Sequence, residues 1–286
     1  MPVVVTGASG FIGRSVVAAF ARTSPEVRAY VRRRDRVEEL RALGAKVAVG
    51  GLADLDTLAT VMADAHTLCH LVGGANAPSE GAYHELNAGS VEAALRAAGE
   101  ASVHRVLFLS YPGASPEAAN AYLRAKGAAE EAVRATGIDH VIVRCTHVYG
   151  PRGPWLEAMV ALGRRRPAVV LGTGRQVVAP VFVEDVAAVL AAADDRNRGG
   201  SGTWGLEGPD RVKADALAGL LGARVPRLHL GPGGAARLPA LARRRTGRTA
   251  LEILAADSLA DGPDAAAEFG VPRTPLREGL RRSLAP

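Results

Sequence analysis

The N-terminal segment joins a short run of β-branched residues to three regularly spaced glycines. Val3, Val4 and Val5 predict a buried strand, and the apolar periodicity of residues 15–21 predicts a helix. Between them lie Gly7, Gly10 and Gly13, in the spacing G-x-x-G-x-x-G. In such a turn the first glycine allows the sharp change of direction, the second lets the backbone approach a phosphate, and the third lets the helix pack closely on the strand. The segment therefore predicts a pyrophosphate-binding turn in an α/β protein.

The residues around the glycines support a binding role. Ser9 lies within the turn, and the backbone N–H groups of Phe11 and Ile12 stand at the start of the expected helix, where they attract negative charge. A second strand candidate, Val27–Val31, follows at the distance that a βαβ unit requires. Because the chain contains 33 glycines, a glycine-rich turn that binds nothing is the alternative.

Three arginines follow that second strand. An NAD site usually has an acidic residue about 20 residues past the glycines to hold the ribose hydroxyl, whereas a cation suits the 2′-phosphate of NADP. Here Arg32, Arg33 and Arg34 come first and Asp35 only afterwards. We expect NADP(H) rather than NAD(H), with Arg32 and Arg33 as contacts. A solvated arginine turn is the alternative.

Composition excludes several classes of protein. A chain of 286 residues that is 48% hydrophobic can bury a substantial core, and it has no apolar run approaching the ~20 residues of a membrane span. The first strand follows Met1-Pro2 directly and leaves no room for a signal peptide, so we expect a cytoplasmic location. Cys69 and Cys145 fall in apolar strand-like runs and are expected as buried thiols, and no spacing of His, Cys or carboxylates indicates a metal.

The net charge of +6 could indicate a nucleic-acid partner. The positive charge is almost all arginine and is dispersed among turns, at residues 32–36, 164–166, 243–248 and 281–282. Aromatic residues make up 4% of the chain, too few for a base-stacking platform. We therefore expect a small-molecule substrate and neither a nucleic-acid nor a membrane partner, with monomer and homodimer both open.

Strand and helix patterns alternate along the first 150 residues. The expected strands are 3–6, 27–31, 46–49, 67–72, 105–110 and 139–144, and the expected helices are 36–43, 55–63 with Asp54 as its cap, 83–99 and 118–136. Such alternation predicts an α/β fold with a doubly wound parallel sheet, and ligands bind at the carboxyl ends of its strands.

The second half is richer in Pro, Gly and Arg. We expect a dinucleotide-binding domain over residues 1–150, rejoined by about 177–195, and a smaller substrate-binding lobe formed mainly by 151–286. Helices are expected at 155–164, 183–193, 213–221, 251–259 and 276–284, and residues 231–234 are expected to form a flexible break.

The long helix expected at 118–136 contains a tyrosine and a lysine four residues apart. At this spacing Tyr122 and Lys126 share one helix face. An ammonium beside a phenol lowers the phenol pKa, which suits a proton donor or acceptor. Lys126 is one of only three lysines in a chain that otherwise uses arginine, which favours a functional pair. An ordinary surface pair is the alternative.

Together these motifs resemble the short-chain dehydrogenase/reductase superfamily, in its extended and atypical branches, including NmrA-like and epimerase-like proteins. The resemblance includes Val49-Gly50-Gly51-Leu52, Leu71-Val72-Gly73-Gly74, Asn87, the run from Arg144 to Gly153, Gly172 to Gln176 and Pro180 to Ala187. It implies a Rossmann fold with Gly51 and Leu52 near adenine, Val72 and Gly73 near the ribose and pyrophosphate, and Cys145 to Val148, including His147, near nicotinamide. It also implies that Lys126 bonds the nicotinamide ribose.

Two positions depart from the family pattern. Gly51 stands where related sequences usually carry an aspartate that bonds the adenine amino group, so affinity would depend more on the arginines. The family's catalytic serine usually stands farther from the tyrosine than Ser110 does, and Tyr111 follows it directly. Ser110, or Ser115 in the same loop, is expected to reach a substrate oxygen, although the short loop makes a complete Ser-Tyr-Lys triad doubtful.

Three further side chains are candidates for the substrate site. His147 follows the sixth expected strand, beside the nicotinamide position that the resemblance implies, while Tyr111 and Trp155 are candidate walls; core packing is the alternative for each. His70 and His140 lie in strand patterns and are expected to bond neighbouring backbone groups.

These expectations combine in one hypothesis about function. An NADP(H)-dependent oxidoreductase would act on a carbonyl or conjugated acceptor of a small hydrophobic molecule, with Tyr122, Lys126 and Ser110 as catalytic residues. A non-catalytic NmrA-like sensor of the dinucleotide and an epimerase or dehydratase are the alternatives.

Overall fold

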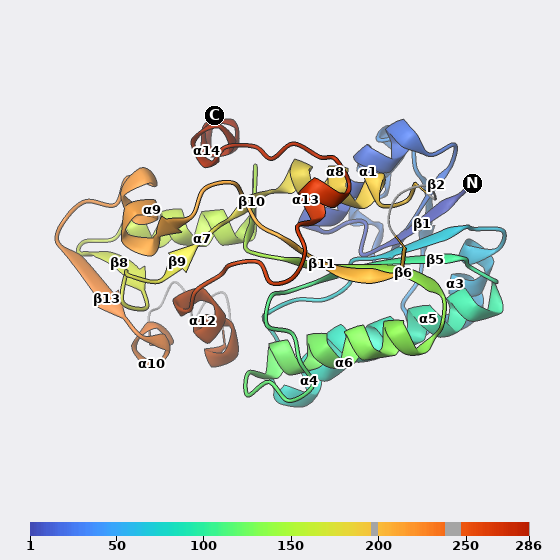
Figure 1. The fold of residues 1–286 in the computed structure, drawn as a ribbon, viewed down its shortest axis with the longest axis horizontal. Coiled ribbons are helices and arrows are strands. Elements are labelled where there is room, and N and C mark those ends of the chain that lie inside the picture. Colours follow the sequence, from blue (N-terminus) through green and yellow to red (C-terminus); the bar gives the residue numbers. More distant parts are fainter. Residues whose placement is uncertain (196–199, 238–246, 286) are drawn as a thin grey trace.

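Seven parallel strands form the central sheet of the computed structural model, which describes residues 1–195, 200–237 and 247–285 (Figure 1). The strands are β1 Val3–Thr6, β2 Val27–Val31, β3 Lys46–Val49, β4 Thr67–His70, β5 Arg105–Ser110, β6 Asp139–Cys145 and β11 Gly202–Leu206. Their order is β11-β6-β5-β4-β1-β2-β3, so the direction of winding reverses between β1 and β4. The predicted doubly wound parallel sheet is confirmed, and the reversal places a ligand site at the carboxyl ends of β1 and β4.

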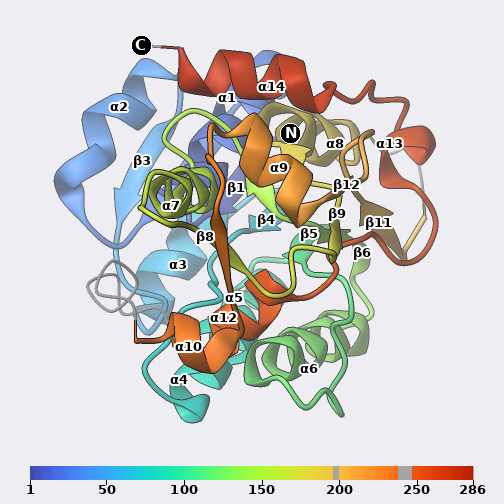
Figure 2. The ribbon, with the colours of Figure 1, turned by 90° about the vertical axis from the view of Figure 1, so that its left-hand side faces the viewer.

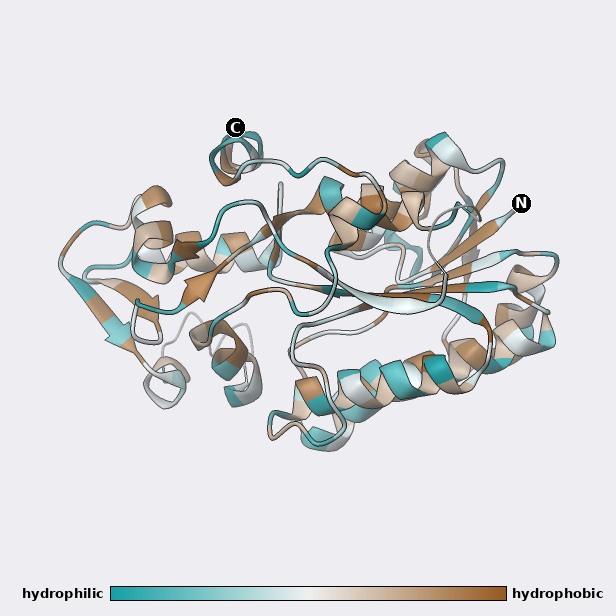
Figure 3. Ribbon diagram, in the orientation of Figure 1, coloured by the Kyte–Doolittle hydropathy of each residue, from teal (hydrophilic) through white to brown (hydrophobic). Residues whose placement is uncertain are grey.

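Helices cover both faces of this sheet. On one side lie α1 Phe11–Thr23, α2 Val37–Ala42, α8 Val183–Ala192 and α13 Ala265–Glu268; on the other lie α3 Leu55–Met62, α5 Ser90–Glu100 and α6 Ala121–Ala135. Val3 and Val5 pack with α1, whereas Val4 packs with α3 and α5. Both faces of the central strand β1 are therefore buried, which explains its unbroken apolar run (Figure 3).

The segment expected as one helix over 83–99 is longer and contains a wide turn. It begins as α4 Glu80–His84, continues as the π-helical segment η2 Glu85–Gly89 and ends as α5. Ser79 caps its start by accepting a hydrogen bond from the backbone N–H of Ala82 at 3.2 Å. A π turn inserts one extra residue and is frequent at functional sites. Sequence periodicity did not predict it.

The lobe at the left of Figure 1 is built from short elements. They are β7 Val148–Tyr149, α7 Pro154–Gly163, β8 Ala168–Leu171, β9 Val177–Val178, β10 Val181–Phe182, β12 Val212–Lys213, α9 Ala214–Leu220, β13 Arg227–Leu230, α10 Pro232–Ala235, α12 Arg248–Ala255 and α14 Leu276–Leu284. Viewed from the lobe side, β8 and β13 stand between α7 and α10 (Figure 2). The chain returns to the main sheet through α8 and also through β11, a strand that the sequence did not predict.

Several expected boundaries are wrong. Residues 231–234 were expected as a flexible break, but Pro232 occupies the first turn of α10, where its missing N–H costs no hydrogen bond. The helix expected from 118 begins at Ala121, because the Asn120 side chain caps it. The helix expected at 251–259 is α12, which begins at Arg248 and ends at Ala255. The strand β4 ends at His70 rather than at residue 72. Most of the arginine cluster at 243–248 lies outside the described residues.

A buried ion pair ties α6 to β6 and to the lobe. Arg144 donates to both carboxylate oxygens of Glu130, at 2.9 and 2.8 Å, and to Asp261 at 2.9 Å. The Glu130 side chain is 1% exposed. Burial acts to raise the pKa of Glu130, but the hydrogen bonds that it accepts outweigh burial and lower the pKa. The carboxylate therefore stays charged and holds α6 against β5 and β6.

Among the described residues, no helix is long and apolar enough to span a bilayer.

Removal of the buried carboxylate tests this account. Glu130→Ala leaves the Arg144 guanidinium without its bidentate partner, so we expect the free energy of unfolding to fall by about 3 kcal/mol in urea denaturation. The neighbouring Glu131→Ala replaces an exposed side chain and should change it by less than about 0.5 kcal/mol. Equal stability of the two variants would show that the pair does not hold α6.

Candidate functional site

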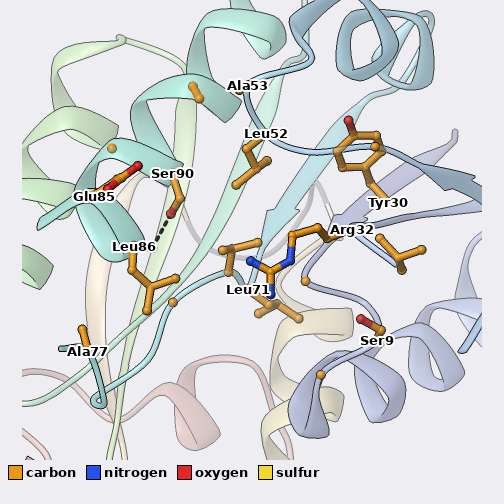
Figure 4. A pocket seen from close by; sticks show the side chains of 18 of the residues that line it. Ser9, Tyr30, Arg32, Leu52, Ala53, Leu71, Ala77, Glu85, Leu86 and Ser90 are labelled. Carbon is orange, nitrogen blue, oxygen red and sulfur yellow. Dashed lines mark hydrogen bonds between the residues drawn. The ribbon is translucent and has the colours of Figure 1, made fainter. Parts of the chain in front are cut away.

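A cavity of about 910 Å³ opens at the carboxyl ends of β1 to β4, where the strand order reverses. Its walls are Gly7, Ser9, Gly10, Tyr30, Val31, Arg32, Gly50, Leu52, Ala53, Leu55, Leu71, Val72, Gly73, Asn76, Ala77, Pro78, Ala82, Glu85, Leu86, Gly89, Ser90, Ala93 and Arg96. Figure 4 shows it as a long slot, with Leu52 and Ala53 at one end and Ala77 at the other. Seven residues predicted from the sequence to bind a cofactor are therefore on its walls: Gly7, Ser9, Gly10, Arg32, Leu52, Val72 and Gly73.

The glycine turn lets α1 approach β1 more closely than side chains would permit. A Cβ on Gly13 would stand 2.3 Å from the carbonyl oxygen of Gly7, and Gly7 itself has φ of +70°. The start of α1 has no side-chain cap, because its capping residue is Gly10. The first N–H groups of the helix, on Phe11 and Ile12, are thus available to an anion.

Only one of the two predicted arginines faces the cavity. The Arg32 side chain lies in its middle (Figure 4), and among the described residues it has no ion-pair partner. Arg33 is 74% exposed, lies 3.9 Å from Asp35 and does not line the cavity. Neighbouring residues of an extended chain point to opposite sides, which separates the two guanidinium groups.

Tyr30 is a wall residue that the sequence did not single out. Its phenol donates a hydrogen bond to the carbonyl oxygen of Gly51 at 2.8 Å. A Cβ on Gly50 would stand 2.3 Å from this phenol oxygen, so a glycine is required there. Gly51 faces open space and does not line the cavity. Tyr30 therefore fixes the loop that presents Leu52.

Asn87, in the π turn, holds the loop that follows β4. Its side chain accepts a hydrogen bond from the N–H of Gly74 at 3.0 Å and donates to the carbonyl of the same residue at 3.1 Å. A Cβ on Gly73 would stand 2.8 Å from the Asn87 oxygen and 3.3 Å from the Lys126 nitrogen. Lys126 therefore reaches the cavity wall at Gly73.

The Lys126 ammonium is buried and contacts a backbone carbonyl and an aromatic ring of β5. Its ammonium donates to the carbonyl oxygen of Leu109 at 2.8 Å and stands 4.7 Å from the centre of the Phe108 ring. Burial lowers the pKa of Lys126 to about 8, with Glu130 acting in the opposite direction. The buried Ser110 hydroxyl makes no hydrogen bond of standard geometry among the described residues, although it lies close enough to Glu130 to lower the pKa of that carboxyl.

Tyr122 lies in an aromatic cluster with the three residues predicted for the substrate site. Its ring contacts Tyr111 edge-on at 5.8 Å, Tyr111 lies 5.8 Å from His147, and His147 stacks on Trp155 at 5.2 Å, all between ring centres. Up to 44 positions of sequence separate these residues, from Tyr111 to Trp155, so only the fold brings them together. Burial raises the pKa of Tyr122, and Lys126 does not offset it, so the expected lowering is wrong for this state.

His147 has one free nitrogen. Its Nδ1 lies 3.3 Å from the Tyr111 hydroxyl, which is itself 2.9 Å from the hydroxyl of Ser258 in the lobe. Its Nε2 is buried and has no partner among the described residues. Burial lowers the pKa of His147 to about 4, so the ring is neutral near pH 7. A neutral imidazole with a free nitrogen can bond an uncharged polar group.

The other predicted residues have mainly structural contacts. The Phe11 ring lies close to Gly150 and Gly153: a Cβ added at these glycines would stand 3.3 and 2.9 Å from the ring. Cys69 and Cys145 are buried free thiols, as predicted. His70 was expected to bond backbone, but its ring nitrogens lie 2.9 Å from the Thr6 hydroxyl and 3.3 Å from that of Ser90. Ser115 lies hydrogen-bonded to Glu117.

The sequence did not predict the cavity wall formed by residues 76–96, because these residues show no clear pattern of residue types. The cavity-lining residues on α4, η2 and α5 recur every three or four positions, but they mix small, apolar and charged types.

Within the described ranges, no cluster of three or more His, Cys, Asp or Glu side chains is arranged to hold a metal ion.

The observed walls fit a dinucleotide. Side-chain carbons at the glycines would fill the cradle, the start of α1 is uncapped, and Arg32, in the middle of the slot, has no ion-pair partner in the part of the chain that the structure describes. These are the groups that bind a pyrophosphate and an additional phosphate.

The titration of Lys126 can be measured directly. Because burial lowers its pKa to about 8, the free protein should hold a charged Lys126 below that pH and a neutral one above it. Three lysines give three side-chain signals in an NMR titration of lysine-labelled protein, and Lys126→Met identifies one of them. Titration of that signal above about pH 10 would contradict the burial that the structure shows.

Comparison with known proteins identifies the family. Residues 7–196 match a family described as NAD(P)H-binding. Ceramide reductase of Caulobacter vibrioides is 32% identical over 190 residues, which cover 66% of this chain and 60% of that protein. The chain thus spans less than two thirds of that relative's length.

Two solved structures share the fold. Triphenylmethane reductase of Citrobacter sp., complexed with NADP(H), superposes with a TM-score of 0.79 at 19% identity, covering 99% of this chain and 100% of that one. UDP-glucose 4-epimerase of Thermotoga maritima gives 0.78 at 20% identity, covering 99% and 97%. With the family match over residues 7–196, about two thirds of its length, the chain belongs to this NAD(P)H-binding family.

Proposed function

We propose that this protein is an NADP(H)-dependent oxidoreductase acting on a carbonyl or conjugated acceptor of a small hydrophobic molecule. The observation that carries the proposal is the position of Lys126. Its ammonium reaches Gly73 on the wall of the dinucleotide cavity, while Tyr122, one helical turn earlier, belongs to the aromatic cluster with Tyr111 and His147. One helix thus connects the cofactor cavity to an apolar region suited to a substrate. The relative named a ceramide reductase is in keeping with an apolar substrate.

Each side chain has a distinct role in this proposal. The bound dinucleotide supplies or accepts a hydride. Lys126 bonds the nicotinamide ribose, and its charge favours proton release from Tyr122 once ligands fill the cavity. Tyr122 transfers the proton to or from the substrate oxygen. Ser110 bonds the same oxygen, and its hydroxyl is free to do so.

The substrate side of the site is defined by His147 and its neighbours. The free Nε2 of His147 bonds a polar group of the substrate, and Tyr111 holds the other ring nitrogen. Trp155 and Tyr111 provide flat apolar walls. A buried nitrogen without a partner costs roughly 1–3 kcal/mol, so a ligand that bonds it gains affinity.

A second candidate, a non-catalytic sensor of the dinucleotide, is favoured by one observation. Burial raises the pKa of Tyr122, and Lys126 bonds the carbonyl of Leu109 instead of the phenol. Ser110, Tyr122 and Lys126 therefore form no hydrogen-bonded chain among the described residues. Cofactor binding without turnover would support this candidate.

The preference for NADP(H) depends on Arg32 in this proposal. Arg32→Gln removes the cation in the cavity and should weaken NADPH binding about tenfold while changing NADH binding by less than about twofold, since only NADPH carries the 2′-phosphate. Calorimetric titration of both cofactors measures the two affinities. The control is Arg22→Gln, which replaces an exposed arginine in the last turn of α1, away from the cavity, and should leave both affinities unchanged. Equal affinity of the unmodified protein for both cofactors would remove the argument.

Catalysis is tested at the phenol. Tyr122→Phe keeps the ring and removes the proton donor, so turnover should fall by a factor of about 10² or more while NADPH binds unchanged. The loss of NADPH absorbance with a panel of hydrophobic ketones, quinones and enones measures turnover. Full activity of the variant would mean that another group donates the proton.

A further inference from the structure

The far wall of the cavity is one continuous helical stripe that ends in a cation. The stripe consists of Ala82, Glu85, Leu86, Gly89, Ser90, Ala93 and Arg96, from α4, η2 and α5. At 1.5 Å per helical residue, Arg96 stands about 16 Å from Glu85. Arg96 therefore belongs to the opposite end of the slot from Asn76 and Ala77.

Arg96 turns to the cavity although acidic partners are in reach. Glu92 precedes it by four residues and Glu100 follows by four, and both spacings favour ion pairs on a helix surface. Within the described chain neither pair forms, and the Arg96 side chain has no other ion pair or hydrogen bond. Arginines elsewhere on the flanking helices do form ion pairs, such as Arg14 of α1 with Glu39 and Arg124 of α6 with Glu80. The guanidinium of Arg96 is thus available to a ligand.

The cavity walls near Arg96 are apolar, while Arg96 itself is exposed. Leu52 packs in one cluster with Ala94, Ala97 and Ala98 of α5, so the loop after β3 lies against the half of α5 that carries Arg96. Leu52 and Ala53 line this end of the cavity (Figure 4), and Leu55 and Ala93, next to them in the chain or on α5, also belong to the cavity walls.

The end of the slot near Arg96 also lacks a nearby acidic wall. Gly51 has no side chain, and Asp54 is occupied in capping α3 through the N–H of Thr57 at 3.1 Å. The carboxylate on the described walls is that of Glu85, three helical turns away. An apolar end without a free carboxylate suits a flat, uncharged, aromatic group better than it suits a cation.

We propose that the Arg96 guanidinium lies on the face of the adenine ring, and that this protein holds the base by its faces rather than by its amino group. The inference rests on the proposed binding of NADP(H). The planar guanidinium stacks on an aromatic surface, which an ammonium does not do. Leu52 contributes apolar contact from the loop after β3.

Binding measurements with two cofactors separate this role from phosphate binding. Arg96→Ala should weaken NADPH and NADH by the same factor, about three- to tenfold, because both contain adenine. Arg96→Lys keeps the charge and loses the planar face, so it should weaken both nearly as much. Glu92→Ala, one turn away on the same helix, should change neither affinity. Calorimetry provides these dissociation constants without any assay of activity.

A cofactor analogue tests whether the protein bonds the amino group of adenine. Replacing adenine by hypoxanthine removes the amino group and keeps the flat ring. We expect the hypoxanthine analogue of NADPH to bind within about twofold of NADPH, since a lost hydrogen bond to a charged partner would cost about tenfold or more. Binding weaker than that would overturn the second half of the proposal.

The remaining outcomes are distinguishable. A loss of NADPH affinity alone in Arg96→Ala, restored by Arg96→Lys, would assign Arg96 to the 2′-phosphate and overturn the proposal. Unchanged affinities in Arg96→Ala, with the unmodified protein binding normally, would also overturn it. Failure of the unmodified protein to bind either cofactor would instead refute the proposed function.

Discussion

The structure depends on how closely the start of α1 approaches the turn after β1. Carbon atoms added at Gly7 or Gly13 would overlap backbone atoms of the neighbouring turn or of the β4 loop, at separations of 2.3–2.9 Å. This contact places the uncapped start of α1 at the point where the strand order reverses. The cavity, the loops that line it and the helix that bears Lys126 are all arranged around that edge of the sheet.

Buried polar contacts hold the edge in place. Tyr30 fixes the loop after β3, Asn87 fixes the loop after β4, and Arg144 joins α6 to β6 and to the lobe. Each of these side chains bonds partly buried backbone groups or buried charged groups that need partners. Because loops at a sheet edge have few apolar contacts, such hydrogen bonds determine where the cavity walls lie.

The proposed catalytic groups differ from a fully assembled proton-transfer site. Lys126 bonds a backbone carbonyl, Ser110 has no standard hydrogen bond in the described chain, and Tyr122 is buried among aromatic rings. The free nitrogen of His147 stands in the same region. These buried groups lie between the dinucleotide cavity and the lobe, so ligands entering there would find donors and acceptors already desolvated. Desolvated groups interact more strongly with charge that develops nearby than hydrated groups do.

The central fold could be predicted from the sequence, because strand and helix periodicity and the glycine spacing are local properties. It predicted the first six strands of the sheet, the glycine turn and Arg32 in the cavity. Only the tertiary structure decided that Arg33 faces solvent, that β11 completes the sheet, and that Tyr111, Tyr122, His147 and Trp155 form one cluster. It also revealed the wall that ends at Arg96. Those contacts join residues far apart in the chain, and their packing depends on side-chain direction and helix register, which no local pattern encodes.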